Sequence, residues 1–314
     1  MNLRQAHLWA QEKLGKSKIK SAVLDAEVIL SFIINLTREK IFSHPEIELT
    51  PNQMKRFQKL ILRRAQFEPI AYLICSKEFY GLNFKVNRQV LIPRPETEIL
   101  VKEALKNIYQ IYYCKSRRNC SQKTRPLKSA TRKKINIVDI GTGSGAIIIS
   151  IIKNLTLNCE LRIMNYEYYA SDISPHAISL AEQNSKRLLE ENIPKIKFIK
   201  SDLFANFPKN LKFDFILANL PYLDLQKIVK TADFQTIKKE PATALDGGRY
   251  GLEIYKKFFQ QLPGHIKKST KIFLEIDPKQ KEPIKKLAQK YLKNLKIKFI
   301  KDLSGRTRIV KIYF

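Results

Sequence analysis

The chain has 314 residues, of which 44% are apolar, so it can bury a sizeable core and is not globally disordered. Its 58 Lys and Arg residues against 29 Asp and Glu residues give a net charge of +29, which attracts RNA, ribosomes or another polyanion but equally fits a composition biased toward Lys, Ile and Asn. Its four cysteines and four histidines lack the spacing of a disulfide framework or a metal site, so we expect no metal.

Residues 1–73 predict a small bundle of helices. One of them shows an apolar stripe at helical spacing, formed by Leu24, Val28, Ile29, Phe32 and Ile33. Another is predicted to begin at Thr50–Gln53, which combines a capping hydroxyl, proline at the first helical position and glutamine at the third. It should continue to Arg64, and Pro69 prevents further extension.

The segment 74–93 changes to β-prone residues that partly alternate, with Gly81 as a break. We expect a β-hairpin that links two domains, followed by Pro93–Glu98 and a helix through Leu100 and Leu105. Residues 115–134 are basic, rich in turn formers and without apolar periodicity, which predicts a flexible surface insertion. Contact with RNA and an inert solvated loop are both open interpretations of this insertion.

Short apolar strands alternate with amphipathic helices from Ile135 onward. This alternation predicts an α/β domain with a mainly parallel sheet covered on both faces. The expected strands lie near residues 135–140, 163–171, 196–200, 213–218, 271–276, 296–300 and 308–313.

A glycine-rich loop joins the first of these strands to an apolar helix. Glycines at alternate positions let the chain turn sharply and let a ligand approach the backbone, and the helix start offers free N–H groups. Dinucleotide enzymes use G-x-G-x-x-G, whereas the G-x-G-x-G spacing of this loop favours S-adenosylmethionine. The candidate cofactor residues of this segment are Asp139, Gly141, Thr142, Gly143, Ser144 and Gly145.

Polar residues also follow the next two expected strands. Asp172 ends the second strand, where a carboxylate can accept both ribose hydroxyls of a cofactor. An ordinary turn residue at a strand end is the alternative. Asp202 and Leu203 follow the third strand, where an adenine would meet a polar edge contact and an apolar wall.

The segment Asn219–Tyr222 places Asn-x-Pro-Tyr at the end of the fourth strand. Ligands of open α/β sheets bind beyond such strand ends, where the strand order reverses. An amide nitrogen is a poor nucleophile, so a site helps by accepting its N–H hydrogens and aiming its lone pair. The Asn219 Oδ1 and the Leu220 carbonyl can do that, while the Tyr222 ring packs on the planar group. The pattern predicts methyl transfer to a planar nitrogen.

With these motifs the chain resembles the PrmC/HemK family of release factor glutamine N5-methyltransferases over nearly its whole length. The resemblance is carried by Glu68–Leu73, Glu78–Leu82, Leu91–Glu98, Asp139–Gly145, Ser171–Pro175, Ser201–Phe204, Asn219–Tyr222, Glu240–Pro241, Ala244–Gly248, Gly251–Leu252, Leu274–Ile276, Gln280 and Asp302–Gly305.

The resemblance implies a helical substrate-recognition domain over 1–73, a β-hairpin linker over 74–93 and a Rossmann-like class I methyltransferase domain over 94–314 with a seven-stranded sheet. It implies S-adenosyl-L-methionine as the methyl donor and the glutamine of the Gly-Gly-Gln motif of class I peptide chain release factors as the acceptor. Cofactor positions then fall on the glycine loop and on Asp172, Leu203 and Asn219. Substrate and catalytic positions fall on Asn219, Leu220, Pro221 and Tyr222.

Arg94 and Glu96 belong to the proline-rich signature, and they either contact the substrate or brace the linker. Two residues depart from the family pattern. Leu220 replaces the usual first proline of Asn-Pro-Pro-Tyr, so Asn219 loses the restriction that a following proline imposes. Cys75 stands where the family usually has glycine.

Two other functions compete with this one. A nucleic-acid methyltransferase acting on adenine N6 or guanine N2 would use the same Asn-x-Pro-Tyr logic, and the positive charge favours it. A non-catalytic binding protein with a decayed site is the other alternative, against which the intact glycine loop and Asp172 argue. We expect a cytoplasmic protein, since no signal peptide or membrane-spanning stretch is visible. We also expect a monomer.

Overall fold

The computed structural model describes residues 1–118, 134–157, 165–191, 195–228 and 234–314. These residues form two compact units. The helical unit comprises Met1–Ser76, Val86–Arg88 and residues 234–240. The sheet unit comprises Lys77–Lys85, residues 89–228 and Pro241–Phe314. The short segment 234–240 therefore groups with the N-terminal helices rather than with the domain expected over 94–314.

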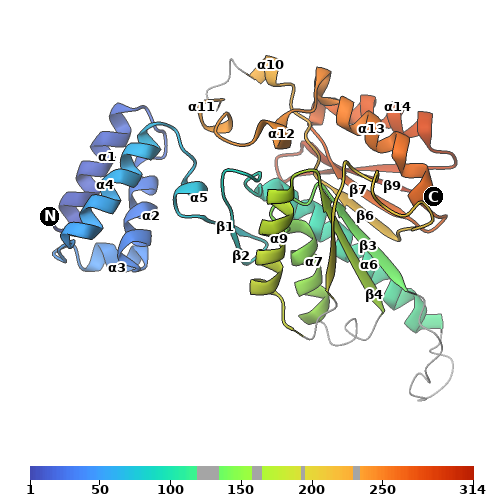
Figure 1. Cartoon of the computed structure of the whole chain (residues 1–314), viewed down its shortest axis with the longest axis horizontal. Coiled ribbons are helices and arrows are strands. Elements are labelled where there is room, and N and C mark those ends of the chain that lie inside the picture. The colour runs from blue at the N-terminus through green and yellow to red at the C-terminus, as the bar shows by residue number, and fades with distance from the viewer. Residues whose placement is uncertain (119–133, 158–164, 192–194, 229–233) are drawn as a thin grey trace. The chain divides into compact units, whose positions relative to one another are not determined.

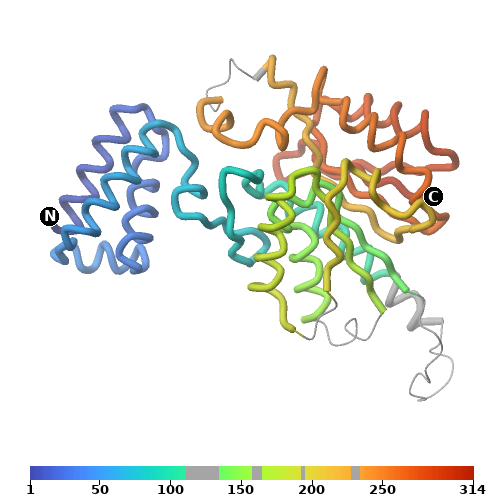
Figure 2. Tube along the Cα trace, viewed as in Figure 1, coloured from blue at the N-terminus to red at the C-terminus, as the bar shows by residue number. Residues whose placement is uncertain are grey.

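The helical unit is a bundle in which α1, α2 and α4 pack side by side (Figure 2). The helix α4 begins as predicted, because Thr50 Oγ1 accepts a hydrogen bond from Gln53 N while the Gln53 side chain accepts one from Thr50 N. The helices of this unit are α1 (Leu3–Lys16), α2 (Ala22–Ile34), α3 (Arg38–Ser43), α4 (Pro51–Ala65), α5 (Ile70–Leu73) and α11 (Phe234–Ile237).

The buried face of α2 differs from the predicted stripe. Ile29 and Ile33 are buried as expected, but Leu24 and Phe32 are 47% and 43% exposed. The helix is apolar on almost every side, so spacing alone does not select the face that packs. Asp25 is buried on that helix instead, where its carboxylate accepts a hydrogen bond from Arg64 Nε of α4 at 2.7 Å.

The sheet unit contains a seven-stranded sheet in the order β5-β4-β3-β6-β7-β9-β8, which confirms the expected fold class (Figure 1). The strand β9 runs antiparallel to both of its neighbours, β7 and β8, and the other neighbouring strands pair in parallel. The order reverses between β3 and β6, so the crevice at their carboxyl ends is the expected ligand site. The strands are β3 (Ile135–Ile140), β4 (Tyr166–Asp172), β5 (Ile196–Lys200), β6 (Phe215–Ala218), β7 (Lys271–Glu275), β8 (Lys296–Lys301) and β9 (Thr307–Tyr313).

Alternate residues of the central strands build two separate cores. Ile137 and Leu217 face the layer that contains α6 and α7, whereas Val138 and Ile216 face the layer that contains α13 and α14. Both faces of the sheet are therefore covered, as strand–helix alternation predicts. The helices of this unit are α6 (Glu98–Arg118), α7 (Ala146–Leu157), α9 (Pro175–Leu188), α10 (Leu225–Ile228), α12 (Ala242–Leu245), α13 (Glu253–Gln261) and α14 (Lys281–Tyr291).

The hairpin is shorter than the segment 74–93. Its strands β1 (Ser76–Phe79) and β2 (Leu82–Lys85) are joined by Tyr80 and Gly81, which both have positive φ, at 51° and 72°. Residues 86–93 form no strand.

The insertion expected over 115–134 begins later than predicted. The helix α6 continues to Arg118, because Lys and Arg are good helix formers even where apolar periodicity ends. Residues 119–133 lie outside the described part of the chain, so the structure does not address the character of that segment.

Candidate active site

A cavity of about 440 Å³ lies beyond the carboxyl ends of the central strands. It is lined by Gly141 and Gly143 after β3, Asp172 at the end of β4, Leu203 after β5 and Asn219 after β6. Its size is typical of a small-molecule site. Four loops that follow four different strands therefore meet at one place, as the motif positions predicted.

The glycine loop takes a course that side chains would prevent. Gly141, Gly143 and Gly145 have φ of 74°, 55° and 82°, in the left-handed region that favours glycine. A Cβ on Gly145 would come within 2.7 Å of the Ile149 side chain. The loop thus lies close against α7, and it presents backbone rather than side chains to the cavity.

The other predicted cofactor residues of Asp139–Gly145 hold the loop in place. Asp139 is fully buried, and its Oδ2 accepts a hydrogen bond from Thr142 Oγ1 at 2.7 Å. Burial raises the pKa of Asp139 to about 7. The Ser144 carbonyl accepts a hydrogen bond from Asn184 Nδ2. Asp139, Thr142, Ser144 and Gly145 do not line the cavity.

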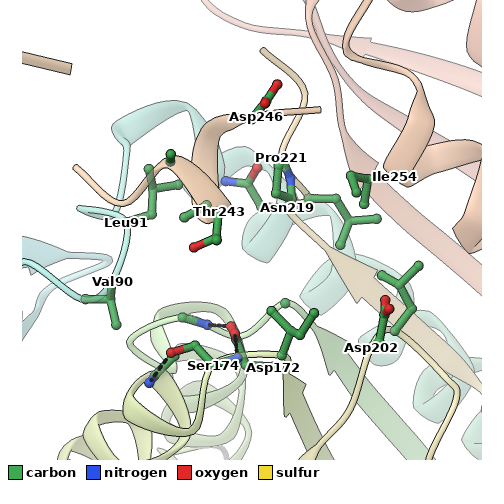
Figure 3. Close-up of a pocket in the computed structure, with 18 of the residues that line it drawn as sticks. Val90, Leu91, Asp172, Ser174, Asp202, Asn219, Pro221, Thr243, Asp246 and Ile254 are labelled. Carbon is green, nitrogen blue, oxygen red and sulfur yellow. Dashed lines mark hydrogen bonds between the residues drawn. The ribbon is translucent and has the colours of Figure 1, made fainter. Parts of the chain in front are cut away.

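Asp172 lies at the edge of the cavity with its carboxylate fixed by backbone donors. Its Oδ2 accepts from Gly143 N and its Oδ1 accepts from Ser174 N, both at 2.9 Å (Figure 3). Desolvation raises the pKa of Asp172, and these two bonds oppose that effect. Each oxygen keeps a lone pair for a further donor. This carboxylate can therefore accept two neighbouring hydroxyls of a ribose.

Leu203 lines the cavity in a strained backbone conformation. Its φ is 56°, and its side chain is buried. Left-handed backbone at a residue other than glycine, asparagine or aspartate is uncommon and often marks a functional site. The neighbouring Asp202 also lines the cavity and forms an ion pair with Lys257.

Asn219 is one end of a hydrogen-bond network that leads away from the cavity. Its Nδ2 donates to Thr97 Oγ1 at 3.0 Å, and Thr97 Oγ1 donates to Glu275 Oε2 at 2.6 Å. The Tyr222 hydroxyl donates to the other carboxylate oxygen of Glu275 at 3.1 Å. Glu275 is 1% exposed, and burial raises its pKa. The sequence alone does not single out Thr97 or Glu275, although both lie within the motifs that carry the family resemblance.

The rest of the Asn219–Tyr222 segment is held from both sides. Leu220 lines the cavity but is only 2% exposed, and its Cδ2 would lie 3.2 Å from a Cβ placed on Gly141. Pro221 also lines the cavity, whereas Tyr222 does not. The Tyr222 carbonyl accepts a hydrogen bond from Gln280 Nε2 at 3.0 Å. Figure 3 shows Asn219 and Pro221 across the cavity from Asp172.

Arg94 and Glu96 do not line the cavity. They act on the network behind it through their charges. Burial raises the pKa of Tyr222, and the charge of Arg94 opposes that shift. Burial likewise raises the pKa of Glu275, and the charge of Glu96 adds to the shift. Contact of these two residues with the substrate and bracing of the linker both stay predictions.

The described residues contain neither a metal-binding cluster nor a membrane-spanning helix. No group of three or more His, Cys, Asp or Glu side chains is arranged to hold a metal ion. No helix in this part of the chain combines the length and the apolar character needed to cross a membrane.

Family models match most of the chain. Residues 5–74 match the PrmC N-terminal domain, and residues 131–293 match a methyltransferase domain. Among solved structures, the hMettl16 catalytic domain in complex with MAT2A 3′UTR hairpin 1 aligns with a TM-score of 0.50 at 14% identity over 90% of each chain. This likeness concerns the fold alone.

Curated relatives align over the whole chain. A release factor glutamine methyltransferase of Bacillus cereus is 31% identical over 99% of this chain and 98% of its own length. A release factor glutamine methyltransferase of Moorella thermoacetica is 32% identical over 100% of this chain and 99% of its own length. A bifunctional methyltransferase of Rickettsia conorii is 33% identical over 96% of this chain but only 56% of its own length. The chain thus spans about half the length of such bifunctional relatives.

Proposed function

Because the chain belongs to the family of release factor glutamine methyltransferases, we propose that it methylates the side-chain amide nitrogen (N5) of the glutamine in the Gly-Gly-Gln motif of class I peptide chain release factors. The observation that carries the proposal is the composition of one cavity. Asn219, Leu220 and Pro221 line it together with Gly141, Gly143 and Asp172, so an acceptor site adjoins a cofactor site.

The residues of the cavity fit S-adenosyl-L-methionine, the methyl donor of this family. The glycine loop leaves room for its amino acid portion, Asp172 can accept the ribose hydroxyls, and Leu203 provides an apolar wall for the adenine. When bound, this group supplies a methyl carbon activated by a sulfonium. We assign the cofactor contacts to Gly141, Gly143, Asp172, Leu203 and Asn219, with Asp139, Thr142, Ser144 and Gly145 shaping the loop.

The chain's own residues prepare the acceptor amide. The Asn219 Oδ1 and the Leu220 carbonyl accept its two N–H hydrogens, and Pro221 shapes the surface against which the planar group packs. Tyr222, which does not line the cavity, anchors this segment through its hydrogen bond to Glu275. Orientation of two bound reactants can contribute on the order of 7–11 kcal/mol to a barrier reduction. Positioning is thus the main contribution that we assign to these residues.

The helical unit is the part that we assign to recognition of the release factor. We place its domain at residues 1–73, the hairpin linker at 74–93 and the methyltransferase domain at 94–314. This division follows the match of residues 5–74 to the PrmC N-terminal domain and of residues 131–293 to the methyltransferase domain.

The direct test is transfer of labelled methyl from S-adenosylmethionine by the full chain. The substrates are a purified class I release factor, a copy whose Gly-Gly-Gln glutamine is changed to alanine, and an RNA sample. Label on the intact factor alone supports the proposal. Label on RNA alone would move the enzyme to the nucleic-acid methyltransferases, a class that the net charge of +29 favours.

A further inference from the structure

The Asn219 amide could face its site in two ways, with either its oxygen or its nitrogen toward the cavity. Only the oxygen accepts an N–H hydrogen from the acceptor group, so the choice decides whether the site functions. Asn219 Nδ2 donates to Thr97 Oγ1, which leaves Oδ1 for the cavity that Asn219 lines. Two buried residues impose this choice: Thr97, which contacts Asn219, and Glu275, which contacts Thr97.

We propose that Thr97 and Glu275 are positioning residues that fix the orientation of the Asn219 amide, and with it the preference of the site for an N–H donor. The inference rests on the proposed function and deepens it. Neither residue lines the cavity, so both act through Asn219 rather than on the substrate itself.

The direction follows from counting donors and acceptors. Both carboxylate oxygens of Glu275 accept a hydrogen bond, one from Thr97 Oγ1 at 2.6 Å and the other from the Tyr222 hydroxyl at 3.1 Å. A threonine hydroxyl has one proton, and Thr97 gives it to Glu275. Its oxygen can then only accept from Asn219. The reversed amide would bring two acceptor oxygens together about 3 Å apart.

Burial makes this arrangement decisive. Thr97 is 3% exposed and Glu275 is 1% exposed. Water therefore cannot replace a lost partner in the relay, by which we mean the hydrogen bonds that join Asn219, Thr97 and Glu275. The same carboxylate also holds the Tyr222 hydroxyl. One buried group therefore sets both the acceptor oxygen of Asn219 and the position of the tyrosine that follows it.

The first test removes the hydroxyl while keeping its shape. Thr97→Val should lower kcat for methyl transfer about 10- to 100-fold, the factor expected for an unpaired buried amide. Thr97→Ser should restore most of the rate. The matched control is Thr270→Val. The Thr270 hydroxyl is also buried, donates to the Phe213 carbonyl and accepts from Lys267 N, but Thr270 does not line the cavity. This control should lose stability and keep kcat.

The second test reverses the relay. In Asn219→Asp, two carboxylates compete for the single Thr97 proton, and kcat should fall. Adding Glu275→Gln supplies a nitrogen that donates to Thr97, so that Thr97 can donate to the carboxylate introduced at position 219. The double variant should then be about tenfold or more faster than Asn219→Asp alone. A purely structural role for Glu275 predicts a further loss instead.

A third readout needs no activity. In protein labelled with ¹⁵N-asparagine, the Asn219 side-chain resonance, assigned by its loss in Asn219→Asp, should shift and exchange faster in Thr97→Val and remain in place in Thr270→Val. An unmoved resonance, or a double variant no faster than Asn219→Asp, would overturn the relay. A wild-type chain that methylates no release factor overturns the proposed function instead, and the resonance then still tests the relay.

Discussion

Two opposing effects meet at Leu220, between Asn219 and Pro221. Proline at this position would restrict Asn219 before the substrate binds, as in the usual family motif. The leucine side chain, however, is 2% exposed and packs toward Gly141. Preorganisation and packing therefore favour different residues at the same position.

We expect Leu220→Pro to raise turnover and lower stability. A restriction worth about 0.4–1 kcal/mol corresponds to a roughly two- to fivefold higher kcat, while the loss of buried leucine surface should lower the free energy of unfolding by about 2 kcal/mol. Steady-state kinetics and urea unfolding measure the two effects separately. A kcat that is unchanged or lower would reject the preorganisation account.

Asp139 gives a pH-dependent prediction at the same scale. Its pKa is raised by burial to about 7 in the folded chain, against an ordinary value of about 4 when unfolded. The folded state therefore binds the extra proton between these values, and stability contributed by that proton is present below about pH 4 and lost as the pH rises toward 7. Thr142 and Asp172 act on the same carboxylate, the first lowering and the second raising its pKa.

Asp139→Asn removes this titration. The difference in free energy of unfolding, variant minus wild type, should rise between pH 4 and pH 7 by at most about 1.4 kcal/mol per pH unit and be flat above pH 8. Urea unfolding of both proteins across this range measures it. A difference that stays constant from pH 4 to pH 8 would show that Asp139 is already ionised at the lower pH.

At the scale of elements, Gln280 at the end of the short 3-10 helix Pro278–Gln280 holds the backbone of Tyr222. Gln280 Nε2 donates to the carbonyls of Tyr222 and Gly251, at 3.0 and 2.9 Å. A Cβ on Gly251 would overlap the Tyr222 carbonyl oxygen. The close approach of these two backbone segments thus requires glycine, in addition to its φ of 67°.

Gly251→Ala should displace Tyr222 and lower methyl transfer at least about tenfold, with a loss of stability of about 1–3 kcal/mol. Gly305→Ala is the matched control, because Gly305 has φ of 79° but no atom within 4 Å of the added Cβ. It should show the backbone strain without the overlap, and keep its activity. Equal activities in the two variants would mean that the contact with Tyr222 does not position the tyrosine.

The elements also show how far the sequence determines the fold. Strands β3 and β5 lie where alternation placed them, since short buried runs bounded by turns leave few options. The prediction of the buried face of α2 was wrong in part, because the spacing of apolar residues in an almost wholly apolar helix does not indicate which side packs. In the site, the sequence could locate Asn219 and Asp172 at strand ends. It could not reveal the Thr97–Glu275 pair, whose members lie 178 positions apart and meet only in the folded chain.

At the scale of the whole molecule, each unit has its own buried core. Leu3, Ile29 and Phe57 belong to the core of the helical unit, whereas the sheet unit has the two cores on either side of its strands. The chain contains a single tryptophan, Trp9, which packs against Phe57 in the helical unit. Tryptophan fluorescence therefore reports unfolding of that unit alone.

We expect S-adenosylmethionine to stabilise the two units unequally. A ligand at 100 times its Kd stabilises the form that binds it by about 2.7 kcal/mol, and all residues of the cavity belong to the sheet unit. Amide exchange in β3 and α7 should therefore slow on addition of the cofactor, while the urea midpoint from Trp9 stays in place. Asp172→Asn, with a weakened ribose contact, should lose most of the effect. If the cofactor instead raises the urea midpoint reported by Trp9 together with the protection of the sheet unit from amide exchange, the two units unfold as one cooperative block.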